Sequence, residues 1–258
     1  MQDAFSIVLN HSKQPGIDYT GIFDGHGPNG ENIAAYASRR LCDLVVDAIC
    51  SGTEVTAAIR SSCLALDKEI LNNRKLAATG GTFDGGSTAL AAWMCDGKLH
   101  CLNLGDSRMV VSVAGTAVAV TSDHKPFVAA ERKRITRAGG FVRDERIMSI
   151  LGVARAFGDF VFKTNTKKSA EEQMVTACPD VFSMPVVPEL EFVVLASDGL
   201  WDFMGNQQVI DYVRGGIERF LPLDEICSKL LKITGVPYFR RFSGFAKDNQ
   251  TVIILVFR

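Results

Sequence analysis

Residues 88–113 read TALAAWMCDGKLHCLNLGDSRMVVSV, and this stretch decides the class of fold. Three apolar runs, TALAAW, KLHCLNL and SRMVVSV, are separated by Asp-Gly at 96–97 and Gly-Asp at 105–106. Apolar runs of this length, divided by short glycine-containing turns, are typical of antiparallel strands. The stretch therefore predicts three antiparallel strands in the middle of the chain.

Helical patterns lie on both sides of these strands. In the first of them Ile33, Ala37 and Leu41 recur at a spacing of four, which places them on one face of a helix. Parallel strands are connected through one helix at a time, so helices that come in consecutive pairs disagree with a βαβ fold. We expect an α+β fold, an antiparallel β-sandwich flanked by pairs of helices in four layers, α/β/β/α. The helices are expected at about 31–49 and 55–70, and near 206–214 and 223–233.

The chain has 258 residues, of which 47% are hydrophobic, and this favours a single domain over residues 1–258. The segment 162–177 is polar and aperiodic, which predicts a small flap at about 160–180. Because Met1 stands almost at the start of a strand, we expect the N-terminal strand to be truncated. Further strands are expected at 4–9, 18–23, 191–196 and 251–257, and a short helix at about 127–138.

Composition excludes several classes of function. A net charge of −1 gives no field to hold nucleic acid, and no apolar run approaches the roughly 20 residues of a membrane span. The basic run ERKRITR at 131–137 is interpreted as a solvated helix face. The seven cysteines are scattered without a C-x-x-C pair, which favours a reducing compartment, cytoplasmic and/or nuclear. We expect a monomer.

Five aspartates stand at the ends of predicted strands. Asp24, Asp106 and Asp198 follow strands, whereas Asp3 and Asp248 precede them. In an antiparallel sheet the start of one strand lies beside the end of its neighbour, so these acids can converge if the edges of two sheets meet. Converging carboxylates need cations, and oxygen ligands suit Mg²⁺ or Mn²⁺. Spacing alone leaves two interpretations open, a metal site and a set of ordinary Asp turns.

Eight short motifs are spread along nearly the whole chain. They are FDGHG at 23–27, GGSTA at 85–89, LGDSR at 104–108, DHKP at 123–126, RITRAGGFV at 134–142, LGVARAFGD at 151–159, SDGLWDF at 197–203 and DNQT at 248–251. In this order they resemble the motifs of the metal-dependent Ser/Thr protein phosphatases of the 2C type, the PPM family. That resemblance implies a pair of packed antiparallel sheets with helix pairs outside.

The resemblance implies a site for two Mn²⁺ or Mg²⁺ ions. Asp24 would bridge both ions, and Gly25 would offer its carbonyl to one of them. Asp198 and Asp248 would complete the ligands of the other ion. Asp106 would belong to a weaker third site that it shares with Asp198.

The resemblance also implies roles around the ions. Asp3 and Thr88 would act through metal-bound waters, and His26 would be the general acid for the leaving hydroxyl. Gly85, Gly86 and Ser87 would shape the entry of a strand. The residues expected to hold the scaffold are Arg108, His124, Arg155 and Trp201.

Two departures from the family keep an alternative open. Gln2 stands where the family usually has Glu, so it can hydrogen-bond a metal-bound water but brings no charge. The family places a phosphate-binding arginine three residues before Met1, a position that this chain does not contain. The expected function is hydrolysis of phosphoserine and phosphothreonine on proteins by a water that bridges two ions, with phosphoprotein substrates as partners and the cysteines uninvolved. The alternative is a catalytically weak or inactive phosphatase-like scaffold that binds regulatory partners.

Overall fold

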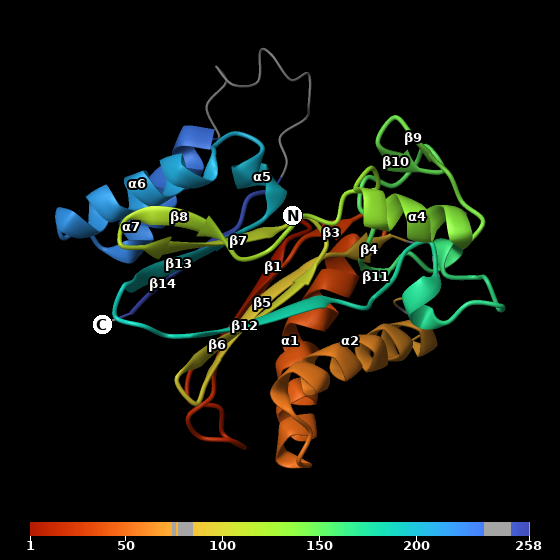
Figure 1. The fold of residues 1–258 in the computed structure, drawn as a ribbon, viewed down its shortest axis with the longest axis horizontal. Helices are drawn as coiled ribbons and strands as arrows, with labels where there is room; N and C mark the ends of the chain where they lie inside the picture. The colour runs from red at the N-terminus through yellow and green to blue at the C-terminus, as the bar shows by residue number, and fades with distance from the viewer. Residues whose placement is uncertain (74–75, 77–84, 235–248, 258) are drawn as a thin grey trace.

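Two antiparallel sheets form the centre of the protein (Figure 1). The computed structural model describes residues 1–73, 76, 85–234 and 249–257. The first sheet has the order β1 (Ala4–Val8), β2 (Asp18–Phe23), β5 (Ala89–Cys95), β6 (Lys98–Leu104) and β12 (Asp180–Pro185). The second sheet has the order β14 (Val252–Val256), β13 (Leu190–Ala196), β7 (Arg108–Val113) and β8 (Thr116–Ala119).

The sheets pack face to face through one buried apolar cluster. Ile22 and Leu90 of the first sheet lie in this cluster with Val111 and Leu195 of the second, and all four are fully buried. Burying such side chains contributes about 1.5–3 kcal/mol each. The strands of residues 88–113 therefore supply apolar side chains to both halves of the sandwich.

Pairs of helices cover the two outer faces. On the first sheet, α1 (Gly30–Cys50) and α2 (Val55–Asn72) pack over a cluster that contains Trp93, and the Glu54 side chain caps α2 by accepting the Ala57 N–H at 3.0 Å. On the second sheet, α6 (Asn206–Glu218) and α7 (Leu223–Thr234) pack over a separate cluster, together with the short α5 (Asp198–Trp201). The predicted four-layer α+β arrangement is confirmed.

The strands that sequence patterns missed are short or lie at edges. β8 and β12 are edge strands without a continuous buried face, so their apolar alternation is weak. A small sheet of two-residue strands joins distant segments, and a two-stranded ribbon follows α4. These are β3 (Gly25–His26), β4 (Gly86–Ser87) and β11 (Phe157–Gly158), and the ribbon strands β9 (Val142–Arg143) and β10 (Arg146–Ile147).

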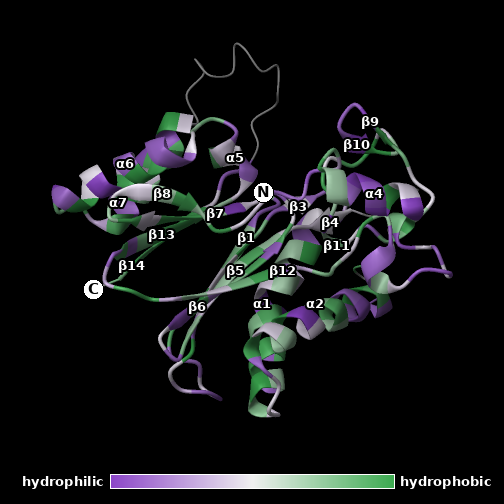
Figure 2. Ribbon diagram, in the orientation of Figure 1, coloured by the Kyte–Doolittle hydropathy of each residue, from purple (hydrophilic) through white to green (hydrophobic). Residues whose placement is uncertain are grey.

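The segment around α4 (Ala129–Arg137) has its own small core. Ile135, Phe162 and Val175 are buried together, and the predicted flap, with 3₁₀ turns at Phe160–Phe162 and Ala170–Glu172, packs against α4. Figure 2 shows how hydrophilic residues gather here, while the central strands are mostly hydrophobic. The interpretation of residues 131–137 as a solvated helix face holds for Arg132, Lys133 and Arg137, which are exposed. It does not hold for Glu131, which is only 3% exposed, or for Ile135, which is fully buried.

None of the helices in the described ranges is both long enough and apolar enough to cross a membrane.

Candidate functional site

The ends of β1 and β2 bring two of the predicted acids to one edge. The register pairs Ala4 with Phe23, so Asp3 and Asp24 are the next residues at the same end of the hairpin. Thr88 is bonded to the backbone of Asp24 in both directions. Its hydroxyl accepts the Asp24 N–H at 3.2 Å, and its own N–H donates to the Asp24 carbonyl at 2.9 Å.

The second sheet meets this edge where β13 ends and β14 begins. The hydroxyls of Thr251 and Ser197 both donate to Oδ2 of Asp3, at 2.7 and 3.3 Å. The Gln2 N–H donates to Oδ1 of Asn249 at 2.5 Å. These contacts join residues far apart in the chain, so the two sheet edges face each other, which is the condition under which the acids can converge.

The predicted metal ligands are only partly described. Asp198 follows Ser197 directly and begins α5, and Asp106 follows β6, whereas Asp248 lies outside the described residues. Within the described ranges no three acidic, histidine or cysteine side chains gather closely enough to hold a metal ion by themselves. The structure thus brings predicted ligands to one end of the sandwich, and their roles as ligands stay a prediction.

Gly25 lies in a tight cradle of backbone oxygens. A Cβ atom at this position would lie 2.5 Å from the Gly30 carbonyl oxygen and 2.6 Å from that of Gln2. No larger residue fits there, so the turn after Asp24 packs directly against the start of β1. Carboxylate and carbonyl oxygens are the donors that Mg²⁺ and Mn²⁺ prefer, and the surroundings of Asp24 and Gly25 fit such an ion.

His26 has a buried acidic partner that was not among the predicted site residues. Its Nε2 lies 2.8 Å from Oδ2 of Asp159, whose side chain is fully buried. Burial lowers the pKa of His26, but the charge and hydrogen bond of Asp159 outweigh it and the pKa is raised from its usual value. A Cβ on Gly86 would overlap the Asp159 carboxylate, so glycine is required for this approach. The sequence signal for Asp159 is its place at the end of the motif at 151–159.

A lysine lies between two of the predicted ligands. Lys125 Nζ is 2.5 Å from Oδ2 of Asp106 and 3.8 Å from Oδ2 of Asp198. Burial lowers the pKa of Lys125, but these two carboxylates raise it well above its usual value, so the ammonium stays charged. Lys125 lies in the motif at 123–126, but it is not among the predicted site residues.

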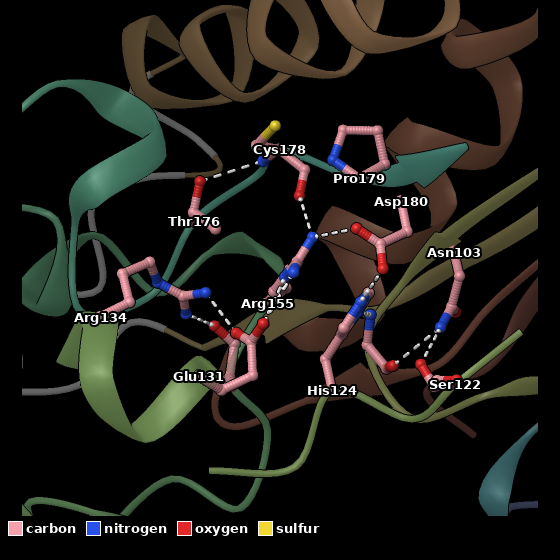
Figure 3. A network of polar contacts seen from close by, with 12 residues as sticks. Asn103, Ser122, His124, Glu131, Arg134, Arg155, Thr176, Cys178, Pro179 and Asp180 are labelled. Carbon is pink, nitrogen blue, oxygen red and sulfur yellow. Dashed lines mark hydrogen bonds and ion pairs between the residues drawn. The ribbon is translucent and has the colours of Figure 1, made fainter. Parts of the chain in front are cut away.

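A network of buried ion pairs lies beside this site (Figure 3). Glu131 accepts bonds from Arg155 at 2.7 and 3.1 Å and pairs with Arg134. Arg155 also donates to Asp180 at 2.8 Å, and Asp180 lies 3.3 Å from Nε2 of His124. Burial raises the pKa of Glu131, but the two guanidinium groups outweigh it and lower the pKa below its usual value.

The network reaches Asp106 through the backbone. His124 Nδ1 accepts the Gly105 N–H at 3.1 Å, and the His124 N–H donates to the Gly105 carbonyl at 2.9 Å. Because Nδ1 is an acceptor, a neutral His124 carries its proton on Nε2 and donates it to Asp180. The bonds of His124 to Gly105 support its predicted scaffold role, and the bonds of Arg155 to Glu131 and Asp180 support the same role for Arg155.

Arg108 and Trp201, also predicted as scaffold, contact each other. The Trp201 indole N–H donates to the Arg108 carbonyl at 3.1 Å, and the Arg108 guanidinium lies 5.5 Å from the indole ring centre.

The cysteines are free thiols, and burial raises the pKa of Cys63 well above its usual value. A buried thiol of that kind is a poor nucleophile, and for the cysteines as a set the lack of a catalytic role stays a prediction.

Sequence comparisons place the chain in a family. The family model of protein phosphatase 2C matches residues 1–234. Protein phosphatase 2C homolog 2 of Schizosaccharomyces pombe is 36% identical over all of this chain and 69% of its own length. A probable protein phosphatase 2C of Caenorhabditis elegans is 37% identical over 99% of this chain and 70% of its own length.

Comparison with solved structures agrees on the fold. A crystal structure of a phosphatase from a pathogenic strain of Toxoplasma gondii superposes with a TM-score of 0.81, at 24% identity, and covers 99% of this chain and 88% of that one. No comparison favours the alternative of an inactive scaffold. The chain belongs to the protein phosphatase 2C family, the metal-dependent enzymes that remove phosphate from serine and threonine residues of proteins.

Proposed function

We propose that the joined sheet edges form the catalytic centre for hydrolysis of phosphoserine and phosphothreonine on proteins. Asp24, the Gly25 carbonyl, Asp198 and Asp248 would hold two Mn²⁺ or Mg²⁺ ions, and Asp106 would serve a weaker third. When bound, such ions supply an activated water, with a pKa lowered to about 7, and neutralise the charge of the phosphoryl group. The observation that carries the proposal is the pair of hydroxyl bonds from Ser197 and Thr251 to Asp3.

Residues of the chain would position the metal ligands and a water and would protonate the leaving group. Thr88 fixes the backbone of Asp24 through its two bonds, which orients the Asp24 carboxylate. The Gln2 side chain, whose Nε2 donates to the Gly27 carbonyl at 2.7 Å, would leave its amide oxygen to bind water. His26, held by Asp159 at Nε2, would deliver a proton from Nδ1 to the leaving serine or threonine oxygen.

A phosphopeptide assay tests the proposal. Activity should appear with Mn²⁺, disappear with a chelator, and be lost in Asp198→Asn. Calorimetric titration should count at least two Mn²⁺ ions on the wild-type domain. No activity at millimolar Mn²⁺ on any phosphoserine or phosphothreonine peptide would overturn the proposal.

A further inference from the structure

We propose that Lys125 is a tethered cation that competes with divalent metal ions for the carboxylates of Asp106 and Asp198. It would neutralise this pair when no ion is bound and weaken the binding of an ion there. The inference rests on the metal site of the proposed function. It adds a residue of this chain that sets how tightly that site binds its ion.

The first argument is geometric. Lys125 Nζ contacts Asp106 at 2.5 Å, a charge-assisted hydrogen bond, and lies 3.8 Å from Asp198 on the other side. A divalent ion that uses either of these carboxylate oxygens would face the ammonium across a few ångströms. Like charges so close repel strongly in a partly buried site, so ion and ammonium cannot both keep their places.

The second argument is the mounting of the lysine. The two bonds between His124 and Gly105 fix the backbone next to Lys125 relative to the backbone next to Asp106. The His124 carbonyl also accepts the Ala154 N–H at 2.8 Å, and the Lys125 carbonyl accepts the Val128 N–H at 3.1 Å. The backbone is thus held on both sides of Lys125. This keeps the lysine close to the two carboxylates, while the end of its side chain can still rotate.

The third argument is that the ammonium can leave. The Lys125 side chain is 27% exposed, compared with 9% for Asp106, so the lysine side chain borders solvent. The four rotatable bonds of the lysine side chain allow Nζ to move several ångströms while the backbone stays in place. Displacement by an ion therefore needs neither loss of the lysine proton nor a change of fold.

The test compares Mn²⁺ binding by calorimetry in the wild-type domain and in Lys125→Gln. We expect the variant to bind Mn²⁺ about tenfold more tightly at its weakest site, or to gain one ion, because a charge-assisted pair of this strength no longer opposes binding. In the metal-free state the variant should unfold at a lower temperature than the wild type, and Mn²⁺ should raise its unfolding temperature by more.

Two matched variants separate charge from structure. Lys163→Gln removes another partly buried lysine, which pairs with Asp67 at 2.8 Å and whose side chain is 9% exposed, and it should lower stability without changing Mn²⁺ binding. In an Asp106→Asn background, Lys125→Gln should change Mn²⁺ affinity much less, since the main partner of Lys125 is already uncharged.

Each outcome of these experiments either supports or overturns the tethered cation. Equal Mn²⁺ affinity and ion number in wild type and Lys125→Gln overturn the tethered cation and leave the proposed function standing. Binding in Lys125→Gln without any in the wild type supports it. No binding in either protein overturns both proposals. Should Lys125→Gln fail to fold without metal, Mn²⁺ must restore its fold, and a failure to do so while the wild type binds Mn²⁺ overturns the tethered cation.

Discussion

Two neighbouring regions of this protein treat buried carboxylates differently. In the α4 network Glu131 has two guanidinium partners and is 4% exposed at its side chain, so its charge is fully matched inside the protein. At the joined sheet edges, the ammonium of Lys125, whose side chain is 27% exposed, contacts Asp106 and lies 3.8 Å from Asp198. The ion pairs of Glu131 hold the fold, whereas we expect the more exposed lysine contact to exchange for a bound cation.

Substitution of Glu131 should give the largest effect, and this effect should be a loss of unfolding free energy. Glu131→Gln leaves the largely buried guanidinium groups of Arg134 and Arg155 without the Glu131 carboxylate, and only Arg155 keeps another carboxylate partner, Asp180, so we expect a cost of about 3–5 kcal/mol of unfolding free energy. Urea denaturation followed by circular dichroism measures this. Arg132→Ala, at an exposed position of the same helix, should stay within about 0.5 kcal/mol of wild type. A loss for Glu131→Gln no larger than that of the control would show that the network is not structural.

Removal of Asp24 should act on activity instead. Asp24→Asn removes the charge of a predicted metal ligand and should lower kcat/KM on a phosphopeptide about a hundredfold or more, equivalent to about 2.7 kcal/mol. The unfolding free energy without metal should change little, because Asn has nearly the same volume as Asp and the backbone bonds of residue 24 to Thr88 remain. Asp18→Asn, at the other end of the same strand, accepts only a backbone bond from Asn10 and should retain activity. Wild-type activity in Asp24→Asn would exclude Asp24 as a ligand.

The His26–Asp159 pair predicts a smaller, pH-dependent effect. The raised pKa of His26 means that the charged pair stabilises the fold below the unfolded pKa of about 6.5, and that this stability is lost as pH rises through the folded-state pKa. The same shift keeps a general acid protonated to higher pH. Asp159→Asn should therefore move the high-pH limb of the kcat profile to lower pH and reduce kcat about tenfold.

The control for this pair is a second histidine–aspartate contact. His11 Nε2 lies 3.1 Å from Asp43, between the β1–β2 loop and α1, so Asp43→Asn changes the same kind of contact away from the site. Its pH–kcat profile should match the wild type. A profile of Asp159→Asn that also matches would remove Asp159 from the mechanism.

The sequence predicts what depends on local pattern and misses what depends on distant contacts. The β5–β6 hairpin and the helix pairs follow from apolar periods and turn residues, and they are observed. β7 follows β6 after a short turn but pairs with β13 and β8 in the other sheet, which the local pattern does not reveal. The small β3–β4–β11 sheet pairs two-residue strands from distant segments, which no period reveals. Asp159 lies 133 residues from His26, and the burial of Glu131 depends on Arg155, so neither partner is visible in a run of charges.

The smallest change in Mn²⁺ affinity is expected for a substitution at Gln2, because two effects oppose each other there. Gln2→Glu adds a negative charge beside the predicted ligands and should strengthen Mn²⁺ binding by attraction. The same change removes the Nε2 donor to the Gly27 carbonyl, at 2.7 Å, and sets a carboxylate against that oxygen. The net gain in Mn²⁺ affinity should therefore be only about threefold, below the roughly tenfold expected for one full charge-assisted contact. Gln14→Glu, the same substitution in the exposed β1–β2 loop, should leave calorimetric Mn²⁺ affinity unchanged. Weaker binding in Gln2→Glu would mean that the bond to Gly27 positions the site more than charge does.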